Sequence, residues 1–563
     1  MVQEVLISLS LIIVIASITT IVARIIKQPP IIAYLISGIL AGPLFFNIIG
    51  GDSLNVIQIF AHIGVALLLF IVGLSLDLRL LKEVGKVSIF AGSSQIIITI
   101  IVGFLIAIGL GLSNITALYL GLVLAFSSTI VVVKLLSDKK EIDSLHGRIA
   151  LGILMVQDFV AAIALMAIPL INQTGNFISV FYKLGIIFGL IILIFFFTHF
   201  ILNRFLIYLA RSQEILFLFA IAWALTLATL FDYFGFSLEI GALIAGMSLA
   251  SSKYNLELGG KMKPLRDFFI ILFFVFFGSQ LNGMVNYSII RDAIIFSIFI
   301  LIGKPIIIMT TLKMFGYKKR TNFLTGSSLA QISEFSLIIV LLGFTLGHLT
   351  QEVMSLVIII AILTIAISSY GIHHSNFIFN KISNSLNLFE GEISEDIKSN
   401  KKTFEVFLFG YHRIGYKIFK ELQKMKNSCV IIDYNPKVIF ALSKHKINCI
   451  YGDIGDKGFI DDLDFSKAKL IISTIPDEDS NLVVKDKLKE INSNAIFIAT
   501  AENPRSAVDL YEKGIDYVIV PHHLGGDYAA NMINKFHTEK EKYKGAGKKH
   551  LKELNKAKKN SNF

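Results

Sequence analysis

The sequence predicts a polytopic α-helical membrane domain followed by an α/β Rossmann-like domain. The 563 residues are 54% hydrophobic and only 17% charged, with a mean hydropathy of +0.71. That composition excludes an ordinary soluble protein. The apolar residues are concentrated before residue 375, whereas residues 400–563 have a soluble composition. We therefore expect a transmembrane domain, a polar linker, a Rossmann-like domain and a basic tail, at 1–375, 376–402, 403–535 and 536–563.

The membrane domain contains about thirteen apolar segments that are long enough to span a bilayer, for which about 20 residues suffice. Charged loops and breaker residues separate them. The first segment lacks the charged start and cleavage site of a signal peptide, so we expect it to be retained. The expected spans are 4–24, 31–49, 56–76, 88–111, 115–136, 149–171, 178–203, 213–231, 236–251, 267–282, 288–312, 323–347 and 353–374.

Lysine and arginine predict the orientation of these spans. They gather in the odd-numbered loops, which are therefore expected to be cytoplasmic. With thirteen spans, the N-terminus lies outside the cell membrane and the Rossmann-like domain lies in the cytoplasm. The net charge of +11 is explained by these loops and the basic tail. The expected partner is thus the lipid bilayer rather than nucleic acid, and the tail is expected to be a solvated helix.

Asp158 is the most informative residue, because it lies near the middle of an apolar run from Ile149 to Leu170. A charged side chain there costs roughly 2.5–3.5 kcal/mol on insertion scales. One explanation is that Asp158 binds a proton or a cation during transport. The other is a salt bridge with a lysine or arginine that locks two helices together.

Three further ionisable residues lie within the spans. Lys304, between Gly303 and Pro305, could pair with Asp158 when the cation site is empty, or could form a purely structural salt bridge. Glu334 could stabilise a broken helix or help to dehydrate a cation. Glu239 lies nearer a span end and is expected at the membrane interface.

The fifth span contains three consecutive hydroxyl residues, Ser127, Ser128 and Thr129. Such hydroxyls often bond carbonyls of their own helix. Alternatively, they mark an unwound stretch whose oxygens bind a cation. The fifth and twelfth spans each neighbour a span that carries a charge, which suggests an inverted repeat.

Six motifs in the membrane domain resemble the cation:proton antiporter-2 family, and its Kef-type potassium efflux members most of all. The resemblance implies an inverted-repeat antiporter fold in which the fifth and twelfth spans are broken, crossed helices that move against a dimerising panel. The motifs are GILAGP (Gly38 to Pro43), LLLFIVGLSLDL (Leu67 to Leu78), AFSSTIVVVKLL (Ala125 to Leu136), GRIALGILMVQD (Gly147 to Asp158), FFVFFGSQL (Phe273 to Leu281) and LAQISEFSL (Leu329 to Leu337).

The resemblance also assigns roles to individual residues. It implies that Asp158 carries the exchanged ion and that Lys304 matches the membrane lysine of the family. Electrogenic relatives have two adjacent acids where this chain has Gln157 and Asp158. We expect Gln157 to supply an amide oxygen without a second titrating charge. One carboxylate that alternates between a proton and a monovalent cation gives 1:1, electroneutral exchange.

The expected function is therefore K⁺/H⁺ antiport by a homodimer. The sequence leaves open a Na⁺/H⁺ antiporter of the same family and a ligand-gated K⁺ efflux channel, although no filter of the T-V-G-Y-G type occurs. We do not expect an enzyme, since no catalytic constellation accompanies the Rossmann-like fold. No metal site is expected, and the two cysteines, Cys429 and Cys449, are expected to be buried core residues.

The Rossmann-like domain begins with a strand, a glycine turn and an amphipathic helix from Phe404 onwards. Five further strands are expected in SCVIIDYN, NCIYGD, LIISTI, AIFIAT and YVIVP, and their alternation with helical segments predicts a doubly wound parallel sheet. Gly410 and Gly415 occupy two fingerprint positions, but His412 replaces the glycine that lets the backbone approach a pyrophosphate. Asp433 follows about 20 residues later, where an acid that binds ribose is expected.

The motif order resembles the N-terminal subdomain of the RCK (TrkA-N) family, which binds AMP, ATP or NAD(H). The resemblance implies that Arg413, Asp433 and Asp453 approach a nucleotide. AMP suits the substituted turn better than NAD(H). The alternative is a Rossmann-shaped dimerisation module without a ligand.

Overall fold

The structure is a computed structural model that forms two compact units, Met1–Glu392 and Ile393–Phe563. Most of the chain from residue 2 to residue 560 is described. The gaps are residues 51, 76–84, 140, 143, 172–176, 203–205, 207, 210–211, 251, 282–285, 392–403, 412, 426–427, 434–435, 456 and 492–493.

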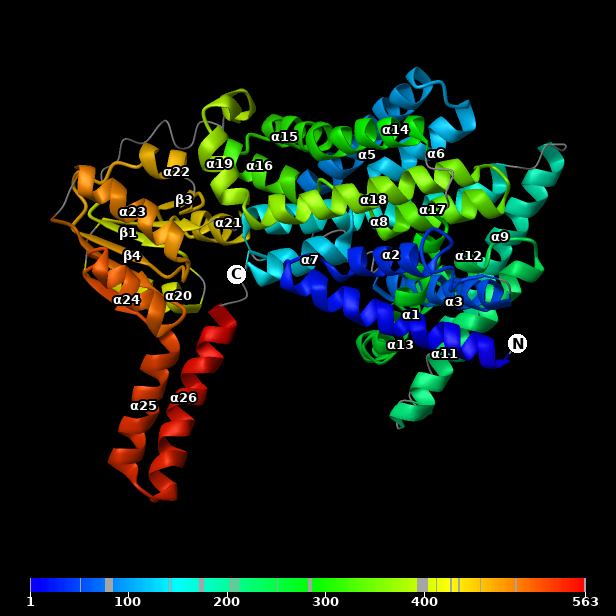
Figure 1. The fold of residues 1–563 in the computed structure, drawn as a ribbon. Helices are drawn as coiled ribbons and strands as arrows, with labels where there is room; N and C mark the ends of the chain where they lie inside the picture. The colour runs from blue at the N-terminus through cyan, green and yellow to red at the C-terminus, as the bar shows by residue number, and fades with distance from the viewer. Residues whose placement is uncertain are drawn as a thin grey trace. The chain divides into compact units, whose positions relative to one another are not determined.

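The first unit is a bundle of apolar helices (Figure 1). Within the described residues, eight segments are long and apolar enough to cross a membrane, so the count of thirteen spans remains a prediction. Up to residue 202, the helices are α1 (Val2–Ile25), α2 (Pro30–Ala41), α3 (Asp52–Ser75), α5 (Gly85–Gly109), α6 (Asn114–Ala125), α7 (Thr129–Asp138), α8 (Leu145–Ile171), α9 (Phe177–Phe197) and η1 (Thr198–Leu202).

The remaining helices of this unit follow from residue 213 onwards. They are α11 (Gln213–Tyr233), α12 (Leu238–Leu249), α13 (Asn255–Ser279), α14 (Tyr287–Ile298), η2 (Phe299–Gly303), α15 (Lys304–Met314), α16 (Lys319–Ser328), α17 (Glu334–Thr345), α18 (Gln351–His373), α19 (Ser375–Ile382) and η3 (Ser385–Phe389).

Several predicted spans differ from the helices observed. The predicted span 31–49 is shorter as a helix, because α2 ends before Gly42 and Pro43. The predicted span 288–312 is a composite of α14, the π-helical turn η2 and α15. Pro305 has no backbone N–H, which explains why the regular helical hydrogen bonds are interrupted just before it.

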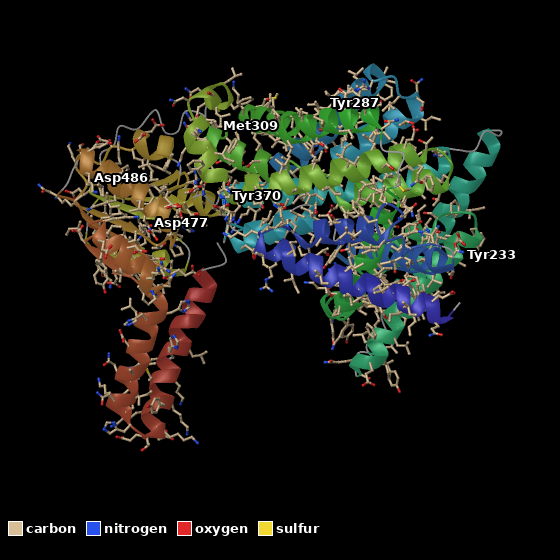
Figure 2. All side chains as sticks on the ribbon, viewed as in Figure 1. Tyr233, Tyr287, Met309, Tyr370, Asp477 and Asp486 are labelled. Carbon is tan, nitrogen blue, oxygen red and sulfur yellow. The ribbon has the colours of Figure 1, made fainter. Side chains whose placement is uncertain are left out.

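Glycines allow the membrane helices to approach closely. Gly38 of α2 faces Gly278 of α13, where an added Cβ would lie 2.9 Å from the neighbouring Cα. Gly73 of α3 likewise faces Gly246 of α12, where a Cβ added to Gly73 would lie 3.0 Å from the Gly246 Cα. Such small residues are typical of interfaces between membrane helices. Exposed Tyr233 and Tyr287, at the ends of α11 and α14 (Figure 2), suit a membrane interface.

The predicted linker is partly folded, which corrects the expectation for 376–402. It contains most of α19 and all of η3. Phe379 and Leu386 are buried against Met309 of α15. These apolar contacts explain why the start of this polar segment belongs to the first compact unit.

The second unit has a six-stranded parallel sheet in the order β3-β2-β1-β4-β5-β6, as predicted for a doubly wound fold (Figure 1). All six predicted strands are present. They are β1 (Val406–Phe409), β2 (Cys429–Asp433), β3 (Cys449–Tyr451), β4 (Leu470–Ser473), β5 (Ile496–Thr500) and β6 (Tyr517–Ile519).

Helices cover both faces of this sheet. On one face pack α20 (Arg413–Leu422) and α21 (Pro436–Lys444). On the other pack α22 (Lys457–Asp462), α23 (Glu478–Ile491) and α24 (Pro504–Glu512). The chain ends with α25 (Pro521–Phe536) and α26 (Lys540–Asn560), so the basic tail is helical as expected.

Candidate functional site

The fifth predicted span is a broken helix. Helix α6 ends at Ala125 and α7 begins at Thr129, with the intervening residues 126–128 extended or non-helical. The Ser128 side chain caps α7 by accepting the backbone N–H of Val131 at 3.2 Å. The hydroxyl residues thus mark an unwound stretch rather than an uninterrupted helix. The break leaves backbone carbonyls of α6 and N–H groups of α7 without helical partners.

The twelfth predicted span is broken in the same manner, between α16 and α17. Ser333 caps α17 by accepting the Phe335 N–H at 3.2 Å, and Ser336 accepts the Ser333 N–H at 3.3 Å. Glu334 is the first residue of α17, as Thr129 is the first of α7. The structure therefore confirms that both predicted spans are broken helices, as the resemblance implied.

The two breaks are hydrogen-bonded to each other. The Ser127 hydroxyl, in the first break, donates to the Leu329 carbonyl of the second at 2.9 Å. In return, Ser336 at the start of α17 donates to the Val123 carbonyl of α6 at 2.6 Å. All of these groups are buried. The breaks therefore form one polar crossing within the apolar bundle.

Lys304 lies fully buried at this crossing. Its ammonium donates to the carbonyls of Leu124 and Phe126 at 3.2 and 3.0 Å, and to the Gln331 carbonyl at 3.2 Å. All three ammonium protons therefore have acceptors from the two breaks. The expected pairing with Asp158 is not formed in this structure. The physical reason is that carbonyls at helix C-termini carry partial negative charge and here need donors.

Asp158, on α8, faces the start of α7. The Thr129 hydroxyl lies 3.2 Å from Oδ1 and 3.0 Å from Oδ2. The N-terminus of a helix favours a negative charge or an anion nearby. Asp158 is half-buried, in contrast to its fully buried neighbour Gln157. The carboxylate is thus held by a helix N-terminus while part of its surface stays open.

Gln157 bonds the backbone of the first break. Its amide oxygen accepts the backbone N–H of Ser127 at 2.8 Å, and its amide nitrogen donates to Gln95 Oε1 at 2.5 Å. Gln95, on α5, donates to the Ala125 carbonyl and the Thr99 hydroxyl, both at 3.0 Å. The two glutamines therefore connect the carbonyl end of α6 to the backbone N–H of Ser127.

Glu334 is a second buried acid near the carboxylate of Asp158. Glu334 is 6% exposed, at the start of α17. Among the described residues, Glu334 Oε2 has no hydrogen-bonding partner. The neighbouring Gln331 in the second break accepts from Ser368 at 2.5 Å.

Glu239 lies near the start of its predicted span, and its expected place at the membrane interface stays a prediction. It is buried in the first turn of α12 and lies 3.6 Å from His62 of α3. Sequence reasoning also missed Gln95 and Ser336. A polar residue inside an apolar helix was the available signal for both.

The nucleotide-binding features expected in the second unit are partly brought together. Gly410 follows β1 with φ +85°, a conformation that favours glycine. A Cβ on Gly415 would overlap the Gly410 carbonyl, so this position in α20 also requires glycine. Asp433, at the end of β2, accepts the Tyr411 N–H at 2.9 Å through Oδ2. The acid therefore lies against the glycine turn, where a ribose-binding residue belongs.

The other expected nucleotide contacts are less defined. Asp453 accepts the Gly455 N–H at 3.0 Å in the turn after β3. His412 lies outside the described residues, and Arg413 is described only as the first residue of α20. Thr474, which sequence reasoning did not single out, donates to the Gly410 carbonyl at 3.1 Å across the β1–β4 switch point.

The two thiols, Cys429 and Cys449, are free and half-buried rather than fully buried. Burial raises the pKa of Cys429 to about 11 and also raises the pKa of Cys449. Both thiols therefore stay protonated and weakly reactive at neutral pH.

Two crossed, broken helices at a membrane carboxylate, together with a doubly wound parallel domain, define a membrane exchanger with a nucleotide-type regulatory module. The family model "Sodium/hydrogen exchanger, transmembrane" matches residues 12–374, and the "TrkA-N domain" model matches residues 406–521. The chain therefore belongs to the sodium/hydrogen exchanger family. It is a multi-pass membrane cation/proton antiporter that carries a TrkA-N domain.

Individual relatives cover most of the chain. The putative cation/proton antiporter YbaL of Escherichia coli K12 is 28% identical over 527 residues, which is 90% of this chain and 93% of YbaL. The glutathione-regulated potassium-efflux system protein KefC of Escherichia coli O127:H6 is 26% identical over 86% of this chain and 78% of KefC. K(+) efflux antiporter 5 of Arabidopsis thaliana is 30% identical over 59% of each chain.

Two solved structures match parts of this chain. The sodium proton antiporter MjNhaP1 of Methanocaldococcus jannaschii is 16% identical, with a TM-score of 0.49, over 68% of this chain and 99% of MjNhaP1. The TrkA-N domain of the inner membrane protein ybaL from Escherichia coli is 18% identical, with a TM-score of 0.23, over 24% of this chain and 100% of that domain.

Proposed function

We propose that this antiporter exchanges K⁺ for H⁺ with 1:1 stoichiometry and that Asp158 carries both ions in turn. The observation that carries the proposal is the position of its half-buried carboxylate at the N-terminus of α7, bonded by Thr129. A protonated carboxyl and a cation-bound carboxylate are both neutral there. The bare carboxylate is penalised by burial, so either ion lowers the cost of the site.

The neighbours of Asp158 support a single titrating carrier. Lys304 gives all three ammonium protons to backbone carbonyls, so its charge is committed to the crossing. Gln157 is neutral and bonds the break. One carboxylate that exchanges one proton for one monovalent cation moves no net charge.

The cation pathway that we propose includes the polar residues of the breaks. Ser127, Ser128 and Thr129 line the first break, and Glu334 begins the second half-helix with an oxygen, Oε2, that has no hydrogen-bonding partner among the described residues. Glu334 would help to dehydrate the incoming cation. The relatives named as K(+) efflux antiporters favour K⁺ as the substrate, and Na⁺ is the alternative within the same family.

The test is proton flux, followed with a dye, in proteoliposomes of the full-length protein with K⁺ or Na⁺ gradients. Asp158→Asn should abolish cation-driven proton flux, because the amide neither releases a proton nor neutralises a cation. Asp267→Asn, at an exposed carboxylate, is the matched control and should retain it. Cation-dependent flux that persists in Asp158→Asn would contradict the assignment. Exchange at a rate independent of imposed membrane potential supports electroneutrality, whereas unitary currents would show a channel.

The proposal also covers the orientation of the chain in the membrane, its domain boundaries and its oligomeric state. We place the N-terminus outside the cell membrane and the TrkA-N domain in the cytoplasm, because basic residues favour the cytoplasmic loops. The boundaries are 1–375 for the transmembrane domain, 376–402 for the linker, 403–535 for the TrkA-N domain and 536–563 for the basic tail, and the protein acts as a homodimer.

The TrkA-N domain binds an adenine nucleotide, AMP in preference to ATP or NAD(H), and regulates exchange. The glycine turn and Asp433 fit such a ligand, whose ribose hydroxyls Asp433 would bind.

A further inference from the structure

Two glutamine side chains close the gap in the first broken helix. Gln95 reaches it from α5 and Gln157 reaches it from α8, and both side chains are fully buried. The Ala125 carbonyl accepts from Gln95 Nε2 at 3.0 Å. Gln95 Oε1 accepts from Gln157 Nε2 at 2.5 Å, and Gln157 Oε1 accepts from the Ser127 N–H at 2.8 Å. We call Gln95 and Gln157 the amide clamp.

The backbone determines the direction of the hydrogen bonds in the amide clamp. The Ala125 carbonyl can only accept a hydrogen bond, and the Ser127 N–H can only donate one. Two primary amides between these ends can satisfy both in a single orientation. That orientation presents the Gln95 carbonyl oxygen to residue 157.

The orientation restricts which side chain is tolerated at position 157. A donor is required there to meet the Gln95 oxygen, and an acceptor is required to meet Ser127. An amide provides both. An ionised carboxylate would set a negative oxygen against the Gln95 oxygen in a buried site, which is costly.

We propose that Gln95 is a positioning residue for exchange, which orients Gln157 and thereby holds the start of α7 against Asp158. This inference rests on the proposed exchange at Asp158. It explains why the fold favours an amide over a carboxylate at position 157. The link runs from Gln95 through Gln157 to Ser127, two residues before the Thr129 hydroxyl that bonds Asp158.

The test measures KM for K⁺ and the pH profile of exchange by the full-length protein in proteoliposomes. Gln95→Met and Gln157→Met should each raise KM about fivefold or more, the change expected from losing a buried hydrogen bond. The double variant should be no worse than the more affected single variant, because the two amides act as one unit. Thr229→Val, which removes an exposed hydroxyl that bonds its own helix, is the control and should leave KM unchanged.

Gln95→Glu separates positioning from simple stability. At high pH the introduced carboxylate cannot donate to Ala125, so KM should be raised. At low pH the carboxylic acid donates to Ala125 and accepts from Gln157, so KM should return towards that of the wild type. A merely structural role predicts a lower melting temperature with no such pH-dependent recovery.

A measurement on the unmodified protein keeps the inference falsifiable if the variants do not fold. The Ser127 N–H lies outside a helix but is bonded and buried, so its hydrogen exchange should be slow. Fast exchange at Ser127, or Gln95 variants with wild-type KM and pH profile, would overturn the inference. If Asp158→Asn abolishes exchange while the Gln95 variants behave as the wild type, only the inference fails. If Asp158→Asn retains exchange, the proposed function fails.

Discussion

Individual buried charges in this protein are paired with groups that their sequence positions do not suggest. Lys304 meets three carbonyls from two helix breaks instead of the carboxylate of Asp158. An ammonium suits that place, because its three protons can satisfy three acceptors at once. Lys304 therefore stabilises the crossing directly and affects Asp158 only through the position of the breaks.

Lys304→Met is expected to lower the melting temperature strongly, since it leaves three buried carbonyls unpaired at roughly 1–3 kcal/mol each. Lys304→Gln keeps an amide donor and should be intermediate. Thermal unfolding in detergent gives the comparison. Asp158→Asn serves as the contrasting variant: it should unfold near the wild-type temperature, because Lys304 does not depend on Asp158. Equal destabilisation by Asp158→Asn would instead indicate a Lys304–Asp158 ion pair.

Glu141, in the loop between α7 and α8, provides a pH-dependent contribution to stability. Burial alone would raise its pKa, but a hydrogen bond with His146 and the charge of Lys139 at 2.9 Å outweigh burial and lower the pKa from 4.5 to about 2. A lowered pKa stabilises the folded state above the unfolded value, and the stabilisation is lost as pH falls towards the folded value.

Glu141→Gln should therefore lower the melting temperature most at neutral pH. The difference from the wild type should begin to shrink below about pH 4.5 and continue to shrink towards pH 2. Melting curves between pH 7 and the lowest pH that the protein tolerates provide the measurement. The control is Glu421→Gln, at an exposed surface pair with Lys424 that should contribute little at any pH. A difference that stays constant across this range would refute the pairing.

At the scale of elements, the two broken helices hold each other in place. Each break exposes carbonyls and N–H groups that apolar neighbours cannot satisfy. The hydroxyls of Ser127 and Ser336 supply donors across the crossing, while Ser128 and Ser333 cap the half-helices that follow. The crossing is therefore maintained by a small set of hydroxyl side chains.

Removing both crossing hydroxyls tests this interdependence. Ser127→Ala and Ser336→Ala should each cost about 1–3 kcal/mol by leaving one buried carbonyl unpaired. The double variant should depart from additivity, because both bonds join the same two elements. Chemical unfolding of the two single variants and the double variant measures the coupling. Ser10→Ala, where an exposed hydroxyl bonds its own helix, should change stability little. Strict additivity would show that the breaks are independent.

At the scale of the whole molecule, the proposed ion site and the proposed nucleotide site belong to separate compact units. The carboxylate that we assign to transport lies in the first unit, and the glycine turn with Asp433 lies in the second. A change confined to the nucleotide site should therefore alter regulation while leaving the ion site intact.

Asp433→Ala should weaken AMP binding by the full-length protein, because the ribose-binding acid is lost, while exchange without nucleotide should be retained. Isothermal titration with AMP, ATP and NADH measures binding, and proteoliposome flux with and without AMP measures regulation. Asp464→Asn, which removes an exposed loop carboxylate, is the control. Unchanged AMP affinity in Asp433→Ala, or no binding by the wild type, would support the ligand-free dimerisation module instead.

Local patterns in the sequence were sufficient to predict much of this protein. Apolar length predicted a membrane domain, and alternating segments predicted all six strands of the parallel sheet. The run Ser127-Ser128-Thr129 offered a break as one of two interpretations, and Asp158 stood out as an acid within an apolar run. Each of these signals depends on residues close together along the chain, which is why composition and periodicity reveal them.

The tertiary structure alone decided how the polar groups pair. Gln157 lies next to Asp158 in the sequence, yet it turns towards Ser127 and Gln95, and Lys304 bonds carbonyls of α6 about 180 residues away. Helix breaks create unpaired backbone groups, and the nearest side chain in space must satisfy them whatever its position in the chain. The sequence by itself therefore determined which carboxylate is the candidate to carry an ion, while the packing of helices decided how its polar neighbours pair.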